Sequence, residues 1–246
     1  MRDNKISAGS FDLNKFLFGG YETDIITTIY GPGASGKTNL CILVAVSQAK
    51  KSNKVIYVDT EGGFSSDRVK QILDIDSAKT EEILKNIFLL KPTNFEEQEL
   101  AFGQLLKHVK KETISLIVID SIAMLYRLEL GDAIKMQDDS KIKEVNRKLA
   151  AQLRILNEIA RKQSIPVIIT NQVYSDFISN EDQKKGIEKS VSMVGGDLLK
   201  YWSKCLIELQ NSNGKRRLIL RKHRSMPEKF LDFEIISKGI RKRGWI

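Results

Sequence analysis

The sequence predicts an α/β fold with a mostly parallel, twisted sheet flanked by helices and antiparallel strands near the C-terminus. Three observations lead to this prediction. Apolar, β-branched runs alternate with helical patterns over most of the chain, which is typical of right-handed βαβ units. A glycine-rich turn joins the first of these runs to a helix. After about Gly195, short strand-like runs are separated by turn residues instead of helices.

The first half of the predicted sheet is built from short apolar runs. The run at Ile25 to Tyr30 reads as a strand, and the segment after Thr38 reads as a helix. Further strands are predicted at Lys54 to Glu61 and, as a strand end, at Ile87 to Leu90. A short helix is predicted between them, around Asp67 to Leu73, because Val69, Ile72 and Leu73 share one face.

The second half continues the alternation and then changes. Pro92 and Asn94 open a helix, and the continuous apolar run Ser115 to Ser121 has the pattern of a strand buried on both faces. The remaining predicted elements are a long helix from about Lys141 to Gln163, a strand at Ile165 to Gln172, a hairpin made of KCLIELQ, NSNG and KRRLILRK, and a last strand KFLDFEII.

Composition limits the class of protein. The chain has 246 residues, 41% of them hydrophobic and 29% charged, as in a folded globular protein that spans residues 1–246 as a single domain. Its apolar runs are shorter than the ~20 residues of a membrane span, so no membrane association is expected. Cys41 and Cys205 show no metal-binding or redox spacing, which favours a reducing, cytoplasmic location.

The positive charge is concentrated near the C-terminus. Residues 200–246 hold 13 Lys and Arg against 4 Asp and Glu, an excess equal to the whole net charge of +9. Such asymmetry indicates an anionic partner, and the alternative is a solvated basic surface without a specific partner.

Residues 31–38 read GPGASGKT and fit the pattern G-x-x-x-x-G-K-[ST] between a strand and a helix. In this context, successive backbone N–H groups and the helix N-terminus form a nest for phosphate oxygens. Gly31, Gly33 and Gly36 are expected to permit positive φ and close backbone approach. The prediction is a site for ATP and Mg²⁺, with residues Gly31, Pro32, Gly33, Ala34, Ser35, Gly36, Lys37, Thr38 and Asn39 around the nucleotide.

Three polar strand ends supply the other parts that ATP hydrolysis needs. Asp120 ends the apolar strand, where a carboxylate beside Mg²⁺ sits, so Thr38 and Asp120 are the predicted metal residues. Glu61 ends the strand after the first helix and is the candidate general base, or else a turn-capping residue. Gln172 is the candidate sensor of the γ-phosphate, with an ordinary polar strand end as the alternative.

The ordered set GPGASGKT, YVDTEGGF, LIVIDS, TNQV and VGGDLL resembles the ATPase core of the RecA/RadA recombinase family, in particular the short archaeal paralogues of RadA. The resemblance covers about Ser7 to Gly239 and implies a RecA-like P-loop NTPase core. It assigns the catalytic glutamate to Glu61 and the γ-phosphate sensor to Gln172. It also places Arg68 against adenine, an arginine that otherwise reads as a surface helix residue. The family's N-terminal helix-hairpin-helix domain and Phe-x-x-Ala peptide are not expected here.

The resemblance also implies DNA binding. The family's two DNA-binding loops match roughly Arg127 to Ser140 and Val173 to Val194, but both segments mix acidic with basic residues. Strand exchange by this chain alone is therefore not expected, and a mediator role is favoured. The candidate DNA contacts are Arg127, Lys184, Lys185, Arg216, Arg217, Arg221, Arg241, Lys242 and Arg243.

Lys222 and Arg224 follow the second hairpin strand. In RecA and DnaB-like helicases, a Lys-x-Lys or Lys-x-Arg pair at the matching place reaches the neighbouring subunit's γ-phosphate. We therefore expect Lys222 and Arg224 to act in trans in a homo-oligomer, with a basic strand end that binds DNA phosphates as the alternative.

The leading functional prediction is a weak, DNA-dependent ATPase that assists homologous recombination and DNA repair. The family implies single-stranded or branched DNA, the RadA recombinase, a Holliday-junction resolvase and the replicative polymerase as partners. Two alternatives stay open: a KaiC-like signalling ATPase or autokinase, and a protein-interaction module that ATP switches without DNA.

Overall fold

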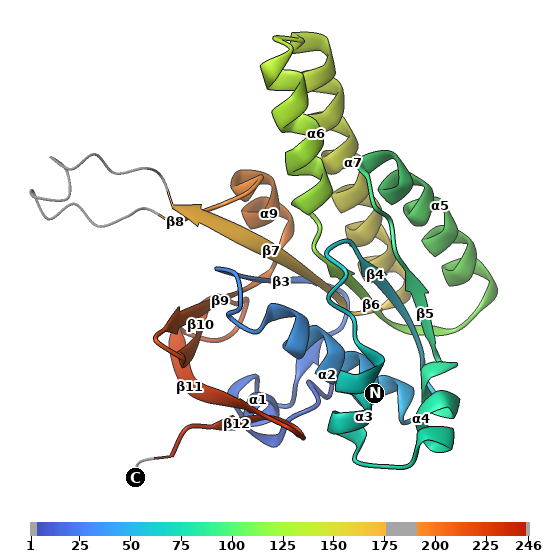
Figure 1. Ribbon diagram of the computed structural model, residues 1–246, viewed down its shortest axis with the longest axis vertical. Coiled ribbons are helices and arrows are strands. Elements are labelled where there is room, and N and C mark those ends of the chain that lie inside the picture. The colour runs from blue at the N-terminus through green and yellow to red at the C-terminus, as the bar shows by residue number, and fades with distance from the viewer. Residues whose placement is uncertain (1–3, 176–190, 245–246) are drawn as a thin grey trace, which may run out of the picture.

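The computed structural model describes residues 4–175 and 191–244. Its main sheet has the strand order β12-β11-β10-β9-β3-β7-β6-β4-β5, and β8 pairs with β7 (Figure 1). The strands of this sheet are β3 (Ile26–Gly31), β4 (Lys54–Asp59), β5 (Ile87–Leu90), β6 (Ile114–Asp120), β7 (Val167–Ser175), β8 (Val191–Met193), β9 (Cys205–Ser212), β10 (Lys215–Lys222), β11 (Lys229–Ile236) and β12 (Gly239–Lys242).

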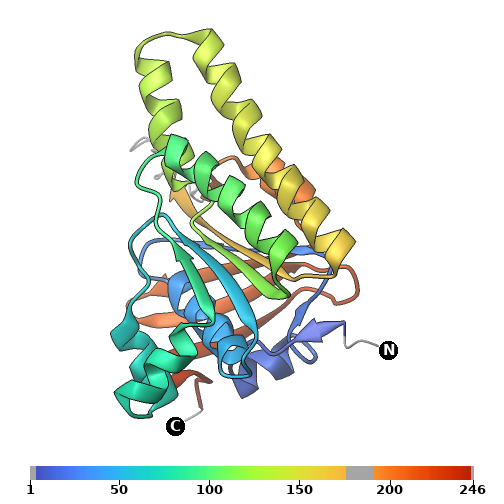
Figure 2. The same cartoon turned by 90° about the vertical axis from the view of Figure 1, so that its right-hand side faces the viewer.

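Helices cover both faces of this sheet (Figures 1 and 2). One face carries α1 (Phe11–Phe16), α2 (Lys37–Ala49), α3 (Ser66–Leu73) and α4 (Ser77–Leu84). The other carries α5 (Phe95–Lys111), α6 (Met124–Lys135), α7 (Asp139–Gln163) and α9 (Gly196–Trp202). A small separate sheet pairs β1 (Lys5–Ile6) with β2 (Tyr21–Glu22).

Two apolar cores result from this layering. Along β4, Val55 and Tyr57 belong to the core under α2, whereas Ile56 and Val58 belong to the core under α5 and α7. The alternation follows from the two-residue period of a strand, and burial on both faces explains why β4, β6 and β7 are continuous apolar runs.

The predicted α/β fold is confirmed. β3, β4, β5, β6, β7 and β9 run parallel, while β10, β11 and β12 are antiparallel at one edge. The strand predicted at Lys54 to Glu61 is shorter in the structure: β4 ends at Asp59, and Thr60 and Glu61 lie in the turn that follows. Seven short elements with weak periodicity were not predicted from the sequence: α1, α4, α9, β1, β2, β8 and β12.

The segment that matches the family's first DNA-binding loop is helical, so the expectation of a loop at Arg127 to Ser140 is wrong. It comprises most of α6 and the start of α7, which extend together beyond the sheet (Figures 1 and 2). Leu125, Tyr126 and Ala133 on α6 are buried, and the Tyr126 hydroxyl donates a hydrogen bond to Asn146 Oδ1 on α7 at 2.7 Å. These contacts stabilise helix where a loop was expected.

Within residues 4–175 and 191–244, no helix is both long and apolar enough to cross a membrane.

Candidate nucleotide site and basic surface

The glycine-rich turn between β3 and α2 has the geometry of a phosphate-binding loop. Gly36 precedes the helix with φ +109°, and Ala34 has φ +56°. The Lys37 side chain folds back over the loop, where Nζ donates hydrogen bonds to the carbonyl oxygens of Gly31 and Pro32 at 3.0 and 2.9 Å. Ser35 is fully buried, and its hydroxyl has no partner among the described protein atoms.

The three glycines of the loop have different roles: the expected positive φ occurs at Gly36, and the expected close backbone approach occurs at Gly31. Only Gly36 lies in the left-handed region, and the other positive φ belongs to Ala34. A Cβ at Gly31 would approach the Leu209 carbonyl oxygen to 2.4 Å, so this glycine allows β9 to pack against β3. At Gly33 a Cβ would meet nothing within 4 Å.

Asp120 at the end of β6 lies directly behind the loop and is 1% exposed. Its carboxylate accepts hydrogen bonds from the Tyr57 hydroxyl at 2.9 Å, from Thr170 Oγ1 at 2.6 Å, and from the Thr38 hydroxyl. Burial raises the pKa of the Asp120 carboxyl, and these hydrogen bonds oppose the shift. Asp120 therefore holds Thr38 in place from behind, consistent with its predicted position beside the metal.

Glu61 and Gln172 meet above the end of β6. Gln172 Nε2 donates a hydrogen bond to Glu61 Oε1 at 3.1 Å, although the two residues come from strands on either side of β6. The turn that carries Glu61 is fixed by Asp59, whose carboxylate accepts hydrogen bonds from the backbone N–H groups of Gly63 and Phe64 at 3.1 and 3.0 Å.

Burial and the facing charges shift the two key groups. Burial raises the pKa of the Glu61 carboxyl; Asp120 and Asp59 add to the shift, while Gln172 and Lys37 oppose it. Burial also lowers the pKa of the Lys37 ammonium, which the nearby carboxylates of Glu61 and Asp120 counteract. A carboxylate with a raised pKa near a buried cation is suited to accept a proton from water.

Arg68 connects three elements. Its guanidinium donates to Asn39 Oδ1 on α2, to Gln71 Oε1 on α3, and to the carbonyl oxygens of Ile236, Ser237 and Gly239 around the turn between β11 and β12. All five N–H donors are thus engaged within the chain. The contact of Arg68 with adenine stays a prediction.

The residues fit Mg²⁺ bound mainly through phosphate oxygens. No group of three or more His, Cys, Asp or Glu side chains in the described parts of the chain is arranged to hold a metal. The Thr38 hydroxyl at the end of the phosphate loop donates to Asp120 and is a candidate protein oxygen for Mg²⁺, which usually binds few protein groups together with substrate phosphates.

Lys222 and Arg224 lie at the opposite edge of the sheet from the phosphate loop. β10 runs antiparallel to β9, and β9 is parallel to β3, so β10 ends where β3 begins. Lys222 Nζ donates to the carbonyl oxygens of Lys200 and Ser203, and Arg224 pairs with Glu22 and Asp24 at 2.9 and 3.0 Å. Neither cation can reach the nucleotide of its own chain.

The C-terminal cations divide into two groups. Arg217, Arg221 and Arg241 form ion pairs with Asp232, Glu208 and Glu234, respectively. Arg216, Lys242 and Arg243 have no carboxylate within ion-pair distance in the described residues. Of the other candidate DNA contacts, Lys184 and Lys185 lie outside the described residues, and Arg127 lines a cavity of about 300 Å³ together with Gln172.

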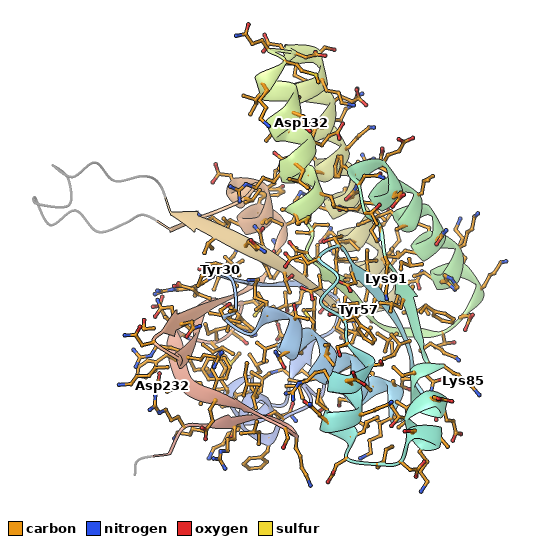
Figure 3. All side chains as sticks on the ribbon, viewed as in Figure 1. Tyr30, Tyr57, Lys85, Lys91, Asp132 and Asp232 are labelled. Atoms are coloured by element: carbon orange, nitrogen blue, oxygen red, sulfur yellow. The ribbon has the colours of Figure 1, made fainter. Side chains whose placement is uncertain are left out.

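Three of these cations, together with Lys215, surround a second cavity of about 390 Å³, and we call Lys215, Arg216, Arg217 and Arg243 the basic cluster. Asp232 is the one carboxylate that lines this cavity; it lies on β11 (Figure 3). Arg216 Nη2 donates to the Ala34 carbonyl oxygen at 3.5 Å, so the basic cluster contacts the phosphate loop directly.

Four residues that build this site were not predicted from the sequence: Tyr57, Asp59, Gly63 and Thr170. Tyr57 and Thr170 hold Asp120, and Asp59 shapes the turn of Glu61. At Gly63, a Cβ would lie 3.0 Å from Thr38 Cγ2, so a larger residue would push the turn away from Thr38. All four lie within the motif strings YVDTEGGF and TNQV, but the partner of Tyr57 and Thr170, Asp120, is distant from both in sequence.

A mixed, mostly parallel sheet with a phosphate loop, a buried strand-end aspartate and a paired glutamate and glutamine defines a P-loop NTPase of the RecA class. A family model described as Rad51 matches residues 2–243. The chain belongs to the Rad51 family.

Relatives within this family share one name. The chain is 39% identical to the "DNA repair and recombination protein RadB" of Methanobrevibacter smithii, with 97% of this chain and 96% of the relative covered. It is 42% identical to the protein of the same name from Methanococcus maripaludis, with 93% and 96% covered. A solved structure titled "Crystal structure of the RadB recombinase" superposes with a TM-score of 0.73 at 33% identity, covering 97% and 99%. The resemblance to archaeal RadB is thereby confirmed.

Proposed function

We propose that this chain is an ATP-binding, weakly hydrolysing DNA-binding protein that assists homologous recombination and DNA repair as a recombinase paralogue or mediator. We also propose that residues 1–246 act as one ATPase domain. The observation that carries the proposal is the hydrogen bond of 3.1 Å between Gln172 and Glu61, above a phosphate loop that holds Lys37 and Thr38.

Each residue of the site has a defined part in hydrolysis. The loop N–H groups and Lys37 bind the phosphates, and Thr38, held by Asp120, would hold Mg²⁺, which would supply positive charge that stabilises the phosphate oxygens. Glu61 accepts the proton of the attacking water, a contribution typically of about 10²–10⁴-fold. Gln172 contacts the γ-phosphate and transmits its presence to Glu61 and to the strand that leads to β8.

The position of Lys222 and Arg224 supports slow hydrolysis by a monomer. Both lie across the sheet from the loop, so they serve a nucleotide only in a head-to-tail homo-oligomer. An arginine finger contributes about 10³–10⁵-fold where it is present.

DNA binding is supported by the basic cluster. Lys215, Arg216, Arg217 and Arg243 line one cavity with the single carboxylate Asp232, and their charge suits a phosphate backbone. Because Arg216 contacts Ala34 of the phosphate loop, nucleotide binding and DNA binding are expected to influence each other.

The biological role follows the relatives, which are named DNA repair and recombination proteins. Single-stranded or branched DNA and the RadA recombinase are the proposed partners, and a Holliday-junction resolvase and the replicative polymerase are further candidates. The cytoplasm is the proposed location.

The test is ATP hydrolysis with and without single-stranded and branched DNA, together with DNA binding at several salt concentrations with and without nucleotide. The proposal predicts slow hydrolysis that DNA stimulates and binding that weakens steeply with salt. ATP binding without any DNA binding at low salt would instead support a protein-partnered ATP switch, and self-phosphorylation would support the KaiC-like alternative.

A further inference from the structure

A second surface lies away from both the phosphate loop and the basic cluster. It is a groove of about 620 Å³ between the start of α1, the last turns of α2 and the end of α3. Figure 1 shows these three helices together on one side of the sheet, far from the extended α6–α7 pair. The groove therefore takes no part in the ATP and DNA sites described above.

The floor and one wall of the groove are apolar. Leu43 and Val46 of α2 and Ile72 of α3 line it, and Phe11 stands at its edge. Phe11 is 80% exposed, the most exposed large hydrophobic side chain in the described part of the chain. An aromatic ring left in water beside an apolar groove is typical of a protein-binding surface.

The charged residues that line the groove are all positive. Lys50 and Lys51 follow the last residue of α2, are exposed, and have no carboxylate within ion-pair distance in the described residues. Lys238 lines the groove as well, but it pairs with Asp74 at 2.6 Å. Two uncompensated lysines thus flank an apolar surface, and no Asp or Glu lines it.

We propose that this groove binds an acidic amphipathic segment of a partner protein. Apolar side chains of the segment pack against Phe11, Val46 and Ile72, while its carboxylates pair with Lys50 and Lys51. This mode of binding is that of an amphipathic helix in an apolar groove, with charge that selects the partner.

The probes are three short, labelled helical peptides. Each carries one residue type at helical spacing along one face and a charged residue type at the other positions. The three pairs are leucine with glutamate, leucine with lysine, and alanine with glutamate. Wild-type protein is expected to bind the leucine–glutamate peptide about tenfold or more tightly than either of the others. Phe11→Ala is expected to weaken this binding by about tenfold or more.

Charge reversal provides the decisive comparison. The double variant Lys50→Glu/Lys51→Glu is expected to lose the leucine–glutamate peptide and to bind the leucine–lysine peptide instead. Lys110→Glu/Lys111→Glu is the matched control, because these exposed lysines end α5 on the other face of the sheet. Leu100→Ala, an exposed residue on α5, is the control for Phe11.

The outcomes separate cleanly and do not depend on ATP or DNA binding. Swapped peptide preference in the groove variant and unchanged preference in the α5 variant support the proposal. Equal losses in both double variants would show that net charge alone attracts the peptide. Such equal losses overturn the proposal. It is also overturned if the leucine–glutamate peptide does not bind, or if Phe11→Ala has no effect.

Discussion

Gln172 on β7 donates a hydrogen bond of 3.1 Å to Glu61, which follows β4, although β6 lies between these two strands. The contact spans the end of β6, where Asp120 holds Thr38 of the phosphate loop. One pair of side chains therefore connects the proposed γ-phosphate sensor on β7 with the candidate base.

Glu61→Gln is expected to reduce ATP turnover by about 10²–10⁴-fold while it leaves nucleotide affinity nearly unchanged, because the amide cannot accept the proton of water. Turnover and nucleotide affinity are measured separately, the latter by titration of a fluorescent ATP analogue. Glu82→Gln, at an exposed position of α4, is the control. Unchanged turnover in Glu61→Gln would exclude Glu61 as the base.

The pH profile of hydrolysis is expected to show an acidic limb. Since burial raises the pKa of the Glu61 carboxyl, the base becomes protonated at a higher pH than an ordinary glutamate. Turnover should therefore fall as pH decreases through that raised pKa and level off above it. The residual activity of Glu61→Gln should lack this limb; the same limb in both proteins would assign it to another group.

Arg243→Ala is expected to weaken DNA binding and to reduce the slope of log affinity against log salt by about 1, as for the loss of one phosphate contact. Arg241→Ala is the matched control, because Arg241 lies on β12 close to Arg243 but pairs with Glu234. Fluorescence anisotropy at several salt concentrations gives both slopes. Equal effects of the two substitutions would argue against the basic cluster as the DNA site.

Arg224→Ala and Lys37→Ala are each expected to abolish most ATP turnover, the first through loss of a trans contact and the second through loss of phosphate binding. In a head-to-tail oligomer, a mixture of the two variants should regain part of the activity, because one variant's nucleotide site faces the other's intact Arg224. Turnover is measured against mixing ratio. Unchanged turnover in Arg224→Ala, with weaker DNA binding, would assign Arg224 to DNA instead.

Arg68→Ala is expected to lower the free energy of unfolding by about 1–3 kcal/mol, since it removes hydrogen bonds that tie α2, α3 and the β11–β12 turn together. Urea denaturation measures the free energy of unfolding, and Lys70→Ala, at an exposed position of α3, is the control. Comparison of ATP and GTP affinities in Arg68→Ala tests the proposed adenine contact independently.

Sequence alone determined the class of this protein because its decisive signals are local. A few neighbouring residues are enough to predict each of them. They are the backbone geometry at Gly36, a lysine and a hydroxyl residue at fixed spacing, and apolar runs of strand length. Glu61, Asp120 and Gln172 were predictable for the same reason, since parallel strands end at one edge of the sheet. Only Asp120 ends its strand, because Glu61 lies in the turn after β4 and β7 continues past Gln172 to Ser175.

Tertiary structure decided which of these residues touch, and which charges remain available. Gln172 and Glu61 are 111 positions apart, and the partners of Arg217 and Arg224 lie 15 and 200 positions away. Charge counting showed a basic C-terminal part but not that four of its arginines, Arg217, Arg221, Arg224 and Arg241, are paired with carboxylates. Pairing depends on strand order and register, which arise from packing of the whole chain and have no local signature.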